Sequence, residues 1–309
     1  ESQKWDDVVR SFNEWDIYYL SGYLKACHLT ENGKPTLFYY EENNMRVINV
    51  AIIRDIAQSK YFTGKLPLNT YYDMSTPYGY GGFLTEGNVT REGILKFMQQ
   101  YSSFCNKYGI ISEFIRFHPM LRNHNNFVDL YDVQYNRDTI FIDLENEEVI
   151  WNNMKSSSRN RIKNISNMNI SVVLDSSGNS IEKFIELYYK TMDKNNAHSY
   201  YYFDKKYFYA LMNLNNSCEI FNLLLDDEII ASMIVLIGNQ FIHYHLGATN
   251  PNYYSISPNN LLFYEVARWG ARNGFKGFHL GGGYLSNNDG LFRFKKTLNR
   301  NGVLSFFIG

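Results

Sequence analysis

Residues 240–283 read QFIHYHLGATNPNYYSISPNNLLFYEVARWGARNGFKGFHLGGG, and this stretch decides the fold. The apolar and aromatic run at residues 241–246 predicts a strand. Ser257 and the proline that follows it predict the start of a helix, which continues with one apolar face until Gly274. Residues 275–280 then predict a second strand, which ends in three glycines. The stretch is therefore a strand–helix–strand unit.

The start of this predicted helix is a candidate anion site. A helix N-terminus presents backbone N–H groups and the positive end of the helix dipole, and both favour a phosphate or a carboxylate. We therefore expect Ser257, Asn259 and Asn260 to bind the phosphate of a donor molecule.

An earlier stretch, residues 68–118, repeats this order of elements. It has an aromatic entry, a loop rich in Gly and Pro, a helix from about Thr90 to Gly109, and a strand that ends at His118. Residue identity between the two stretches is low, so a duplicated α+β unit and a coincidence are both open.

The rest of the chain supplies further elements. Helices are predicted over residues 5–15, 146–167, 181–195 and 205–213, and strands over residues 17–29, 36–40, 46–54, 127–134, 139–144, 170–174, 218–225 and 228–238. The acidic run at residues 145–148 marks a boundary, which gives a first unit of residues 1–144 and a second unit of residues 145–309. The predicted fold class is α+β, with two tandem units that each have a mixed, mostly antiparallel sheet flanked by helices.

Composition excludes several classes of protein. The 309 residues are 45% hydrophobic and 17% aromatic, which is enough to bury the cores of two medium-sized units. A net charge of −1 gives no general attraction to nucleic acid. No apolar run approaches the ~20 residues that cross a bilayer, so we expect a cytoplasmic protein that could act at the inner face of the membrane. The three cysteines lack metal-ligand spacing, so we expect reduced thiols and no metal.

Several short sequences, taken in order, resemble a known family. They are Tyr72-Asp73, the loop PYGYGG at residues 77–82, the basic segment with Arg159 and Arg161, YYKTMDKNNAHSYYY at residues 188–202, Tyr244-His245-Leu246, Ser257-Pro258-Asn259, and LGGG at residues 280–283 followed by Asp289 and Lys295. This order resembles the tandem GNAT-fold acyltransferases of the Fem type, which include peptidoglycan-bridge aminoacyltransferases and relatives that acylate amino sugars. The resemblance implies two GNAT-like units, the first on the side of the acceptor cleft and the second holding the acyl donor.

The chain departs from that family in two places. Residues 252–256 read NYYSI where acetyl-CoA enzymes carry a Gly-rich pyrophosphate loop, and this difference counts against the use of coenzyme A. The long coiled-coil arm of some bridge-forming enzymes has no counterpart in this sequence, and this difference weakens the case for tRNA as the donor.

Acyl transfer to an amine needs a way to remove a proton, donors for the oxyanion, and stabilisation of the leaving group. The candidate catalytic residues are His245, Tyr244 and Asp289. His245 is a base or substrate partner in one interpretation and a histidine satisfied within the sheet in the other. Tyr244 is alternatively a core residue, and Asp289 either holds the acceptor amine or caps a turn.

Candidate substrate-binding residues lie in the two glycine-rich segments. Tyr78 and Tyr80 alternate with glycine and could stack on a sugar or a nucleotide, while Asp73 could receive the acceptor amine. Gly282 is either a site of close approach to a ligand or a turn residue, and Lys295 either meets a phosphate or extends along a helix to solvent.

The segment of residues 155–163 concentrates four cations, among them Arg159 and Arg161. It is either a phosphate clamp for the donor or the solvated face of a helix.

The sequence thus predicts an N-acyltransferase that moves an acyl group from an acyl-CoA-type donor to an amino group of an amino-sugar nucleotide or other cell-envelope precursor. One alternative is transfer from aminoacyl-tRNA to a peptidoglycan precursor. Another is a non-catalytic protein whose tyrosines bind carbohydrate. The acyl group, the acceptor amine and the oligomeric state are left open.

Overall fold

The computed structural model describes residues 2–30, 32–284 and 287–309, and the chain divides into two compact units. Unit 1 comprises Glu1–Asn136 and Phe306–Gly309, and unit 2 comprises Arg137–Ser305. The sequence places the boundary at residue 145, whereas the contacts place it inside strand β6 (Gln134–Asp143). The chain also returns to unit 1 at its last four residues.

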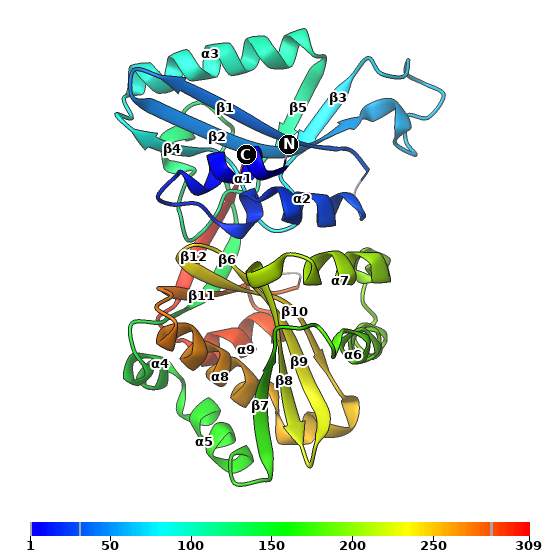
Figure 1. Cartoon of the computed structure of the whole chain (residues 1–309), viewed down its shortest axis with the longest axis vertical. Helices are drawn as coiled ribbons and strands as arrows, with labels where there is room; N and C mark the ends of the chain where they lie inside the picture. The colour runs from blue at the N-terminus through cyan, green and yellow to red at the C-terminus, as the bar shows by residue number, and fades with distance from the viewer. Residues whose placement is uncertain (1, 31, 285–286) are drawn as a thin grey trace. The chain divides into compact units, whose positions relative to one another are not determined.

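The sheet of unit 1 has the strand order β1-β2-β3-β5, and β4 pairs with the other end of β2 (Figure 1). Its strands are β1 (Lys34–Glu42), β2 (Met45–Asp55), β3 (Tyr72–Ser75), β4 (Leu84–Gly87) and β5 (Ile110–Phe114). The pairs are antiparallel except β3 with β5, which is parallel. The helices of unit 1 are α1 (Ser2–Arg10), α2 (Ser21–His28) and α3 (Arg91–Lys107). Helix α3 buries Ile94, Phe97 and Tyr101 in the core of this unit.

The last residues of the structure complete unit 1. The backbone of Ile115 exchanges two hydrogen bonds with Gly309, at 2.8 and 3.0 Å, and the N–H of Phe117 donates to the carbonyl of Phe307 at 3.1 Å. Strand β12 (Val303–Ile308) therefore begins in unit 2 and ends in unit 1.

Two predicted strands of unit 1 are wrong. Residues 17–29 form a 3₁₀ turn and helix α2, because the carboxylate of Asp16 accepts from the N–H of Ile17 at 2.6 Å and starts a helical turn. Helix α2 then buries Tyr23, Leu24 and Cys27, which share one helical face. Residues 127–134 are turns, in which the N–H of residue 131 reaches back to the carbonyl of Phe127, and β6 begins only at Gln134.

The sheet of unit 2 has the strand order β12-β6-β11-β10-β9-β8-β7. Its remaining strands are β7 (Ile170–Asp175), β8 (Cys218–Leu225), β9 (Glu228–Ile237), β10 (Phe241–Thr249) and β11 (Gly277–Gly281). Strands β10 and β11 are parallel, and the pairs β7–β8, β8–β9, β9–β10 and β6–β11 are antiparallel. Figure 1 shows helices on both faces of this sheet.

One face of the unit 2 sheet carries the larger core. It is covered by α4 (Glu147–Asn153), α5 (Ser156–Ile165), α8 (Asn259–Arg272) and α9 (Gly290–Leu298), whose buried side chains pack together with those of β6 and β8–β11. The other face is covered by α6 (Ile181–Lys194) and α7 (Lys205–Met212). The helix predicted over residues 146–167 is two helices, because Met154 and Lys155 have extended backbone angles.

The α+β class with two units is confirmed. In each unit a helix leads into a strand that pairs in parallel with an earlier one: α3 leads into β5 beside β3, and α8 leads into β11 beside β10. Within the described residues, no helix combines the length and the apolar character needed to cross a bilayer.

Candidate active site

Strands β10 and β11 separate in the middle of unit 2. They pair only from Phe241 with Gly277 to His243 with His279, although β10 continues to Thr249 beside β9. The register between β10 and β9 shifts between residues 244 and 246, which places a β-bulge at this point. A bulge redirects a side chain and disturbs the ladder, and bulges are common at active sites. The edge of β10 beyond His243 is thus a candidate ligand-binding edge.

Lys295 lies on one side of this point. Its Nζ donates to the carbonyl of Gly282, directly after β11, at 2.7 Å, and lies 5.1 Å from the centre of the Tyr244 ring on β10. The side chain is only 4% exposed, and burial lowers the pKa of Lys295 to about 7. Asp289 acts in the opposite direction and raises this pKa. Near neutral pH the amine is therefore able both to give and to take a proton.

Asp289 itself begins helix α9. Its Oδ1 accepts from the N–H of Phe292 at 2.8 Å, the geometry of an N-cap, so the capping interpretation has a contact to support it.

His245 lies on the other face of the sheet. Its Nε2 and the hydroxyl of Tyr207 on α7 are 2.7 Å apart, whereas Tyr244 packs on the ring of Phe263 from α8 at 4.9 Å. Burial, and secondly the neighbouring His243, lower the pKa of His245 to about 3. The imidazole is neutral at pH 7 and is a weak base there. Burial raises the pKa of Tyr244 to about 12, so its phenol stays protonated.

The start of α8 has fewer available amides than the sequence suggests. Ser257 has left-handed backbone angles, φ 56° and ψ 53°, and ends the 3₁₀ turn Pro251–Ile256. The N–H of Asn260 donates to the carbonyl of Ser257, and that of Leu261 to the carbonyl of Pro258, each at 3.1 Å. These bonds use two of the first-turn amides that would otherwise face an anion.

The side chains at this helix start are also engaged. Asn259 accepts from the Thr249 hydroxyl at 3.1 Å, which ties α8 to the end of β10. Asn260 is buried, and within the described residues its Oδ1 accepts no hydrogen bond. A buried acceptor without a donor favours an N–H or O–H group of a ligand over a phosphate.

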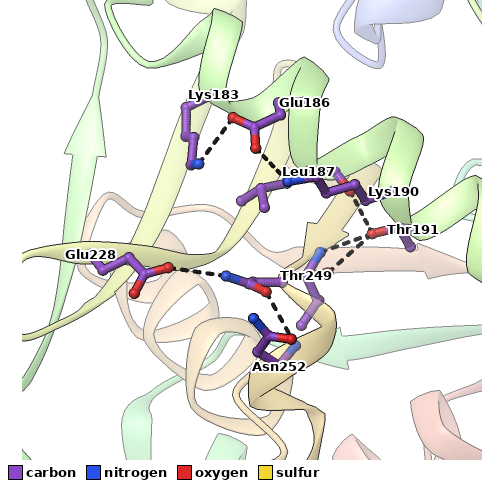
Figure 2. A network of polar contacts seen from close by, with 9 residues as sticks. Lys183, Glu186, Leu187, Lys190, Thr191, Glu228, Thr249 and Asn252 are labelled. Carbon is purple, nitrogen blue, oxygen red and sulfur yellow. Dashed lines mark hydrogen bonds and ion pairs between the residues drawn. The ribbon is translucent and has the colours of Figure 1, made fainter.

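A polar network holds the segment that leads from β10 towards α8. Figure 2 shows Thr191 of α6 beside Thr249: its hydroxyl donates to the carbonyl of Leu187 at 2.8 Å and accepts from the N–H of Thr249 at 3.1 Å. Next along the chain, Asn250 donates to Glu228 at 3.0 Å. The network fixes the far end of β10 to α6 and to β9.

The two arginines lie elsewhere in unit 2. Arg159 donates to the carbonyls of Met154 at 3.2 Å and of residue 151 at 3.4 Å, at the C-terminus of α4, and Arg161 is exposed. Helix α4 is joined to the C-terminal end of α8 by Glu147, which pairs with Arg268 and with residue 272. In the part of the chain that the structure describes, the hydrogen bonds of Arg159 are with the end of α4, and none joins it to Ser257, Asn259 or Asn260.

In unit 1, the predicted acceptor residues are held by neighbours. Asp73 forms two hydrogen bonds with Arg54, at 3.0 and 2.8 Å. The carbonyl of Tyr78 accepts from the hydroxyl of Tyr23 at 2.7 Å. The Tyr80 ring packs edge-on against the ring of residue 18, at 5.4 Å.

Sequence reasoning missed two of these partners. Tyr207 carries no signal beyond its place on the buried face of a predicted helix, and it is 38 residues from His245. Arg54 is a charged residue near the end of a predicted strand, and only the pairing of β2 with β3 shows that it lies opposite Asp73.

Comparisons with known proteins agree with this architecture. Residues 152–296 match the family model described as an acetyltransferase (GNAT) domain. No curated protein matches the sequence. The crystal structure of FemX is similar over 100% of this chain and 95% of its own, with a TM-score of 0.73 and 14% identity. A protein of unknown function from Bacteroides thetaiotaomicron is similar over 100% and 96%, with a TM-score of 0.63 and 12% identity.

A third similar structure is the C-terminal domain of a putative lysylphosphatidylglycerol synthetase from Agrobacterium fabrum. It matches over 99% of this chain and 90% of its own, with a TM-score of 0.58 and 12% identity. Unit 2 therefore contains a segment that matches a GNAT acetyltransferase domain, and the whole chain shares the fold of FemX. The matched domain supports acyltransferase activity.

Proposed function

We propose that the protein is an N-acyltransferase whose reaction takes place where β10 and β11 separate. The observation that carries this proposal is the position of Lys295, whose buried Nζ bridges the carbonyl of Gly282 after β11 and the ring of Tyr244 on β10. A titratable amine at a break in the sheet is the kind of group that acyl transfer needs.

The chemistry assigns Lys295 three tasks. An acceptor amine attacks the carbonyl carbon of the donor, a C–N bond forms, and the C–S or C–O bond to the leaving group breaks. With a pKa of about 7, the protonated amine of Lys295 can donate to the oxyanion and give a proton to the leaving thiolate or alkoxide. Its neutral form can take the proton that the new amide nitrogen loses.

His245 is assigned a positioning task. Because its pKa is about 3, it does not collect the proton at neutral pH. Its bond to Tyr207 fixes the imidazole against α7, on the face opposite to Lys295, so His245 acts by holding β10 in place at the bulge. This assignment replaces the general-base role that the sequence suggests.

An acyl-CoA-type donor is preferred. The β11-facing edge of β10 offers backbone groups to an extended chain that carries amides, and the buried acceptor of Asn260 offers a further bond. The acceptor we propose is an amino group of an amino-sugar nucleotide or another cell-envelope precursor.

A second candidate is transfer from aminoacyl-tRNA to a peptidoglycan precursor. The observation that favours it is the engagement of the Asn260 and Leu261 amides, which weakens the start of α8 as a site for the pyrophosphate of coenzyme A.

A single experiment separates the two donors. The full chain is incubated with a panel of UDP-amino sugars and a peptidoglycan precursor, in one arm with acetyl-CoA or longer acyl-CoAs and in the other with charged tRNA, and the release of free thiol is followed together with the mass of the acceptor. The expected result is thiol release that depends on the acceptor, with a matching mass increase. Transfer from charged tRNA without thiol release would replace the preferred donor with the second one. No transfer from either donor to any acceptor would refute the proposal.

A further inference from the structure

The loop between β2 and β3, residues 56–71, is an ordered projection at one end of the unit 1 sheet. The N–H of Ile56 donates to the carbonyl of Tyr71 at 3.0 Å, which closes the loop at its base. Inside it, the N–H of Phe62 donates to the carbonyl of Ser59, and that of Lys65 to the carbonyl of Phe62, each at 2.9 Å. Figure 1 shows this loop extending beyond the end of β3. It is a compact Ω-type loop.

The loop holds large apolar side chains in water. Tyr61 is 66% exposed and Leu68 is 64% exposed, and Phe62 and Tyr71 are exposed as well. A side chain of this size gains about 1.5–3 kcal/mol when it is fully buried, so four of them on one loop call for an explanation.

A second segment adds to this surface. The N–H of Tyr72 donates to the carbonyl of Gly109 at 2.8 Å, so the end of α3 and the start of β5 lie against the base of the loop. Here Tyr108 is 53% exposed and Ile111 is 63% exposed. We call the combined surface the aromatic–lysine face; it consists of Lys60, Tyr61, Phe62, Lys65, Leu68, Tyr71, Lys107, Tyr108 and Ile111.

The charge of this face is positive. Lys60, Lys65 and Lys107 are exposed, and two of them lie over tyrosine rings of the face at 5.1 and 5.5 Å. Residues 56–71 contain no Asp or Glu. The chain as a whole has a net charge of −1, so this cationic area is local.

The acidic groups nearest in sequence are engaged in hydrogen bonds or ion pairs of their own. Glu113 accepts from Tyr101 at 3.0 Å and from Tyr131 at 2.6 Å in the core, and burial raises the pKa of its carboxyl group. Asp55 accepts from the N–H groups of Ala57 and Asn69, and Asp73 is paired with Arg54 as described above. The lysines of the face therefore keep their charge available to a partner.

We propose that the aromatic–lysine face binds the surface of an anionic phospholipid bilayer. Tyrosine and phenylalanine side chains on a projecting loop can enter the headgroup region, where aromatic rings are favoured, while lysines meet the phosphates. The aliphatic Leu68 and Ile111 suit a lipid boundary better than a nucleic-acid backbone. This proposal concerns unit 1 and does not depend on the donor or acceptor of the proposed transferase.

The test is co-sedimentation of the full chain with vesicles of phosphatidylcholine alone and with vesicles that contain an equal share of phosphatidylglycerol. Binding to the second kind, weakened by salt, is expected. At about 1 kcal/mol for each lysine, the triple variant K60Q/K65Q/K107Q should bind about 100-fold more weakly. The double variant Y61A/F62A should bind at least about tenfold more weakly at every salt concentration.

The matched control is K4Q/K206Q/K276Q, which removes three exposed lysines from other surfaces and lowers the net charge equally. It should bind vesicles as the wild type does. Equal losses in the two triple variants would mean that net charge alone drives the binding, and would overturn the proposal. So would absence of wild-type binding to phosphatidylglycerol vesicles at low salt, or a self-association in solution that disappears in Y61A/F62A.

Discussion

Replacing Lys295 with methionine separates the functional and structural effects of one buried amine. The methionine side chain is of similar length and fits an apolar environment, so the packing around Tyr244 is largely kept. Removing one preorganised donor to a developing oxyanion lowers kcat by about 10²–10³-fold, which corresponds to a rise of about 2.7–4 kcal/mol in the activation free energy. We expect a loss of this size in the thiol-release assay.

The stability of the same variant should change in the opposite direction. The pKa of Lys295 falls from its ordinary value of 10.5 to about 7, which at 1.36 kcal/mol per pKa unit corresponds to about 5 kcal/mol of destabilisation while the amine is charged. Between pH 7 and 10.5 the unfolded chain binds more protons than the folded one, so wild-type stability rises with pH across this interval. The variant lacks this dependence and should therefore be more stable than the wild type, with the largest difference at pH 7 and below.

Urea unfolding at about pH 6 and about pH 10, together with initial rates, measures both effects. The control is Lys296→Met, at an exposed neighbour, which should leave the turnover and the unfolding midpoint unchanged. Wild-type turnover in Lys295→Met would refute the role of this residue, and a variant less stable than the wild type at pH 6 would refute the account of its burial.

Three further changes test individual contacts. Tyr207→Phe removes the partner of a buried His245 nitrogen and should lower the free energy of unfolding, measured in urea, by about 1–3 kcal/mol. Gly79→Ala should lower the free energy of unfolding by at least about 1–3 kcal/mol, because φ is +101° and the new Cβ would lie 2.5 Å from the Tyr18 ring. Arg159→Met should cost about 1 kcal/mol of stability through the lost carbonyl contacts of α4, while donor affinity by calorimetry stays the same.

Each of these has a matched control. Gly64→Ala, at φ +76° with no atom within 4 Å of the new Cβ, carries only the backbone strain, and an equal loss there would contradict the steric reasoning at residue 79. Arg161→Met should be neutral for stability. Weaker donor binding in either arginine variant would support the interpretation of the basic segment as a phosphate clamp. His245→Phe combined with Tyr207→Phe should recover part of the loss, because both polar partners are then gone.

Local signals predicted the elements of unit 2 well. The strand–helix–strand order of residues 240–283 is confirmed, and Gly274 has the positive φ of +79° that ends a helix. The failure at residues 17–29 has a local cause, because Asp16 caps a turn within a run of residues that also suits a strand. Local signals therefore sufficed where a glycine ended the helix, as at Gly274, and failed where a capped turn opened a run that also suits a strand.

The site was harder to predict because its contacts join distant segments. Burial of Lys295 could not be read from the sequence, since lysine is ordinarily exposed. The bond between Tyr207 and His245 depends on how α7 packs on β10, and the bulge that aims His245 depends on the pairing with β9. At Ser257 the sequence did not show that the turn before α8 supplies its own carbonyls to two of the first amides.

The return of residues 306–309 to unit 1 has a consequence for synthesis on the ribosome. The segment from Ile115 to Phe117 emerges early, but the backbone groups of Phe307 and Gly309 that pair with it emerge only after all of unit 2. During that interval the nascent chain carries an open strand edge, which is a site for mispairing with other chains. Unit 1 therefore begins to fold first and finishes last.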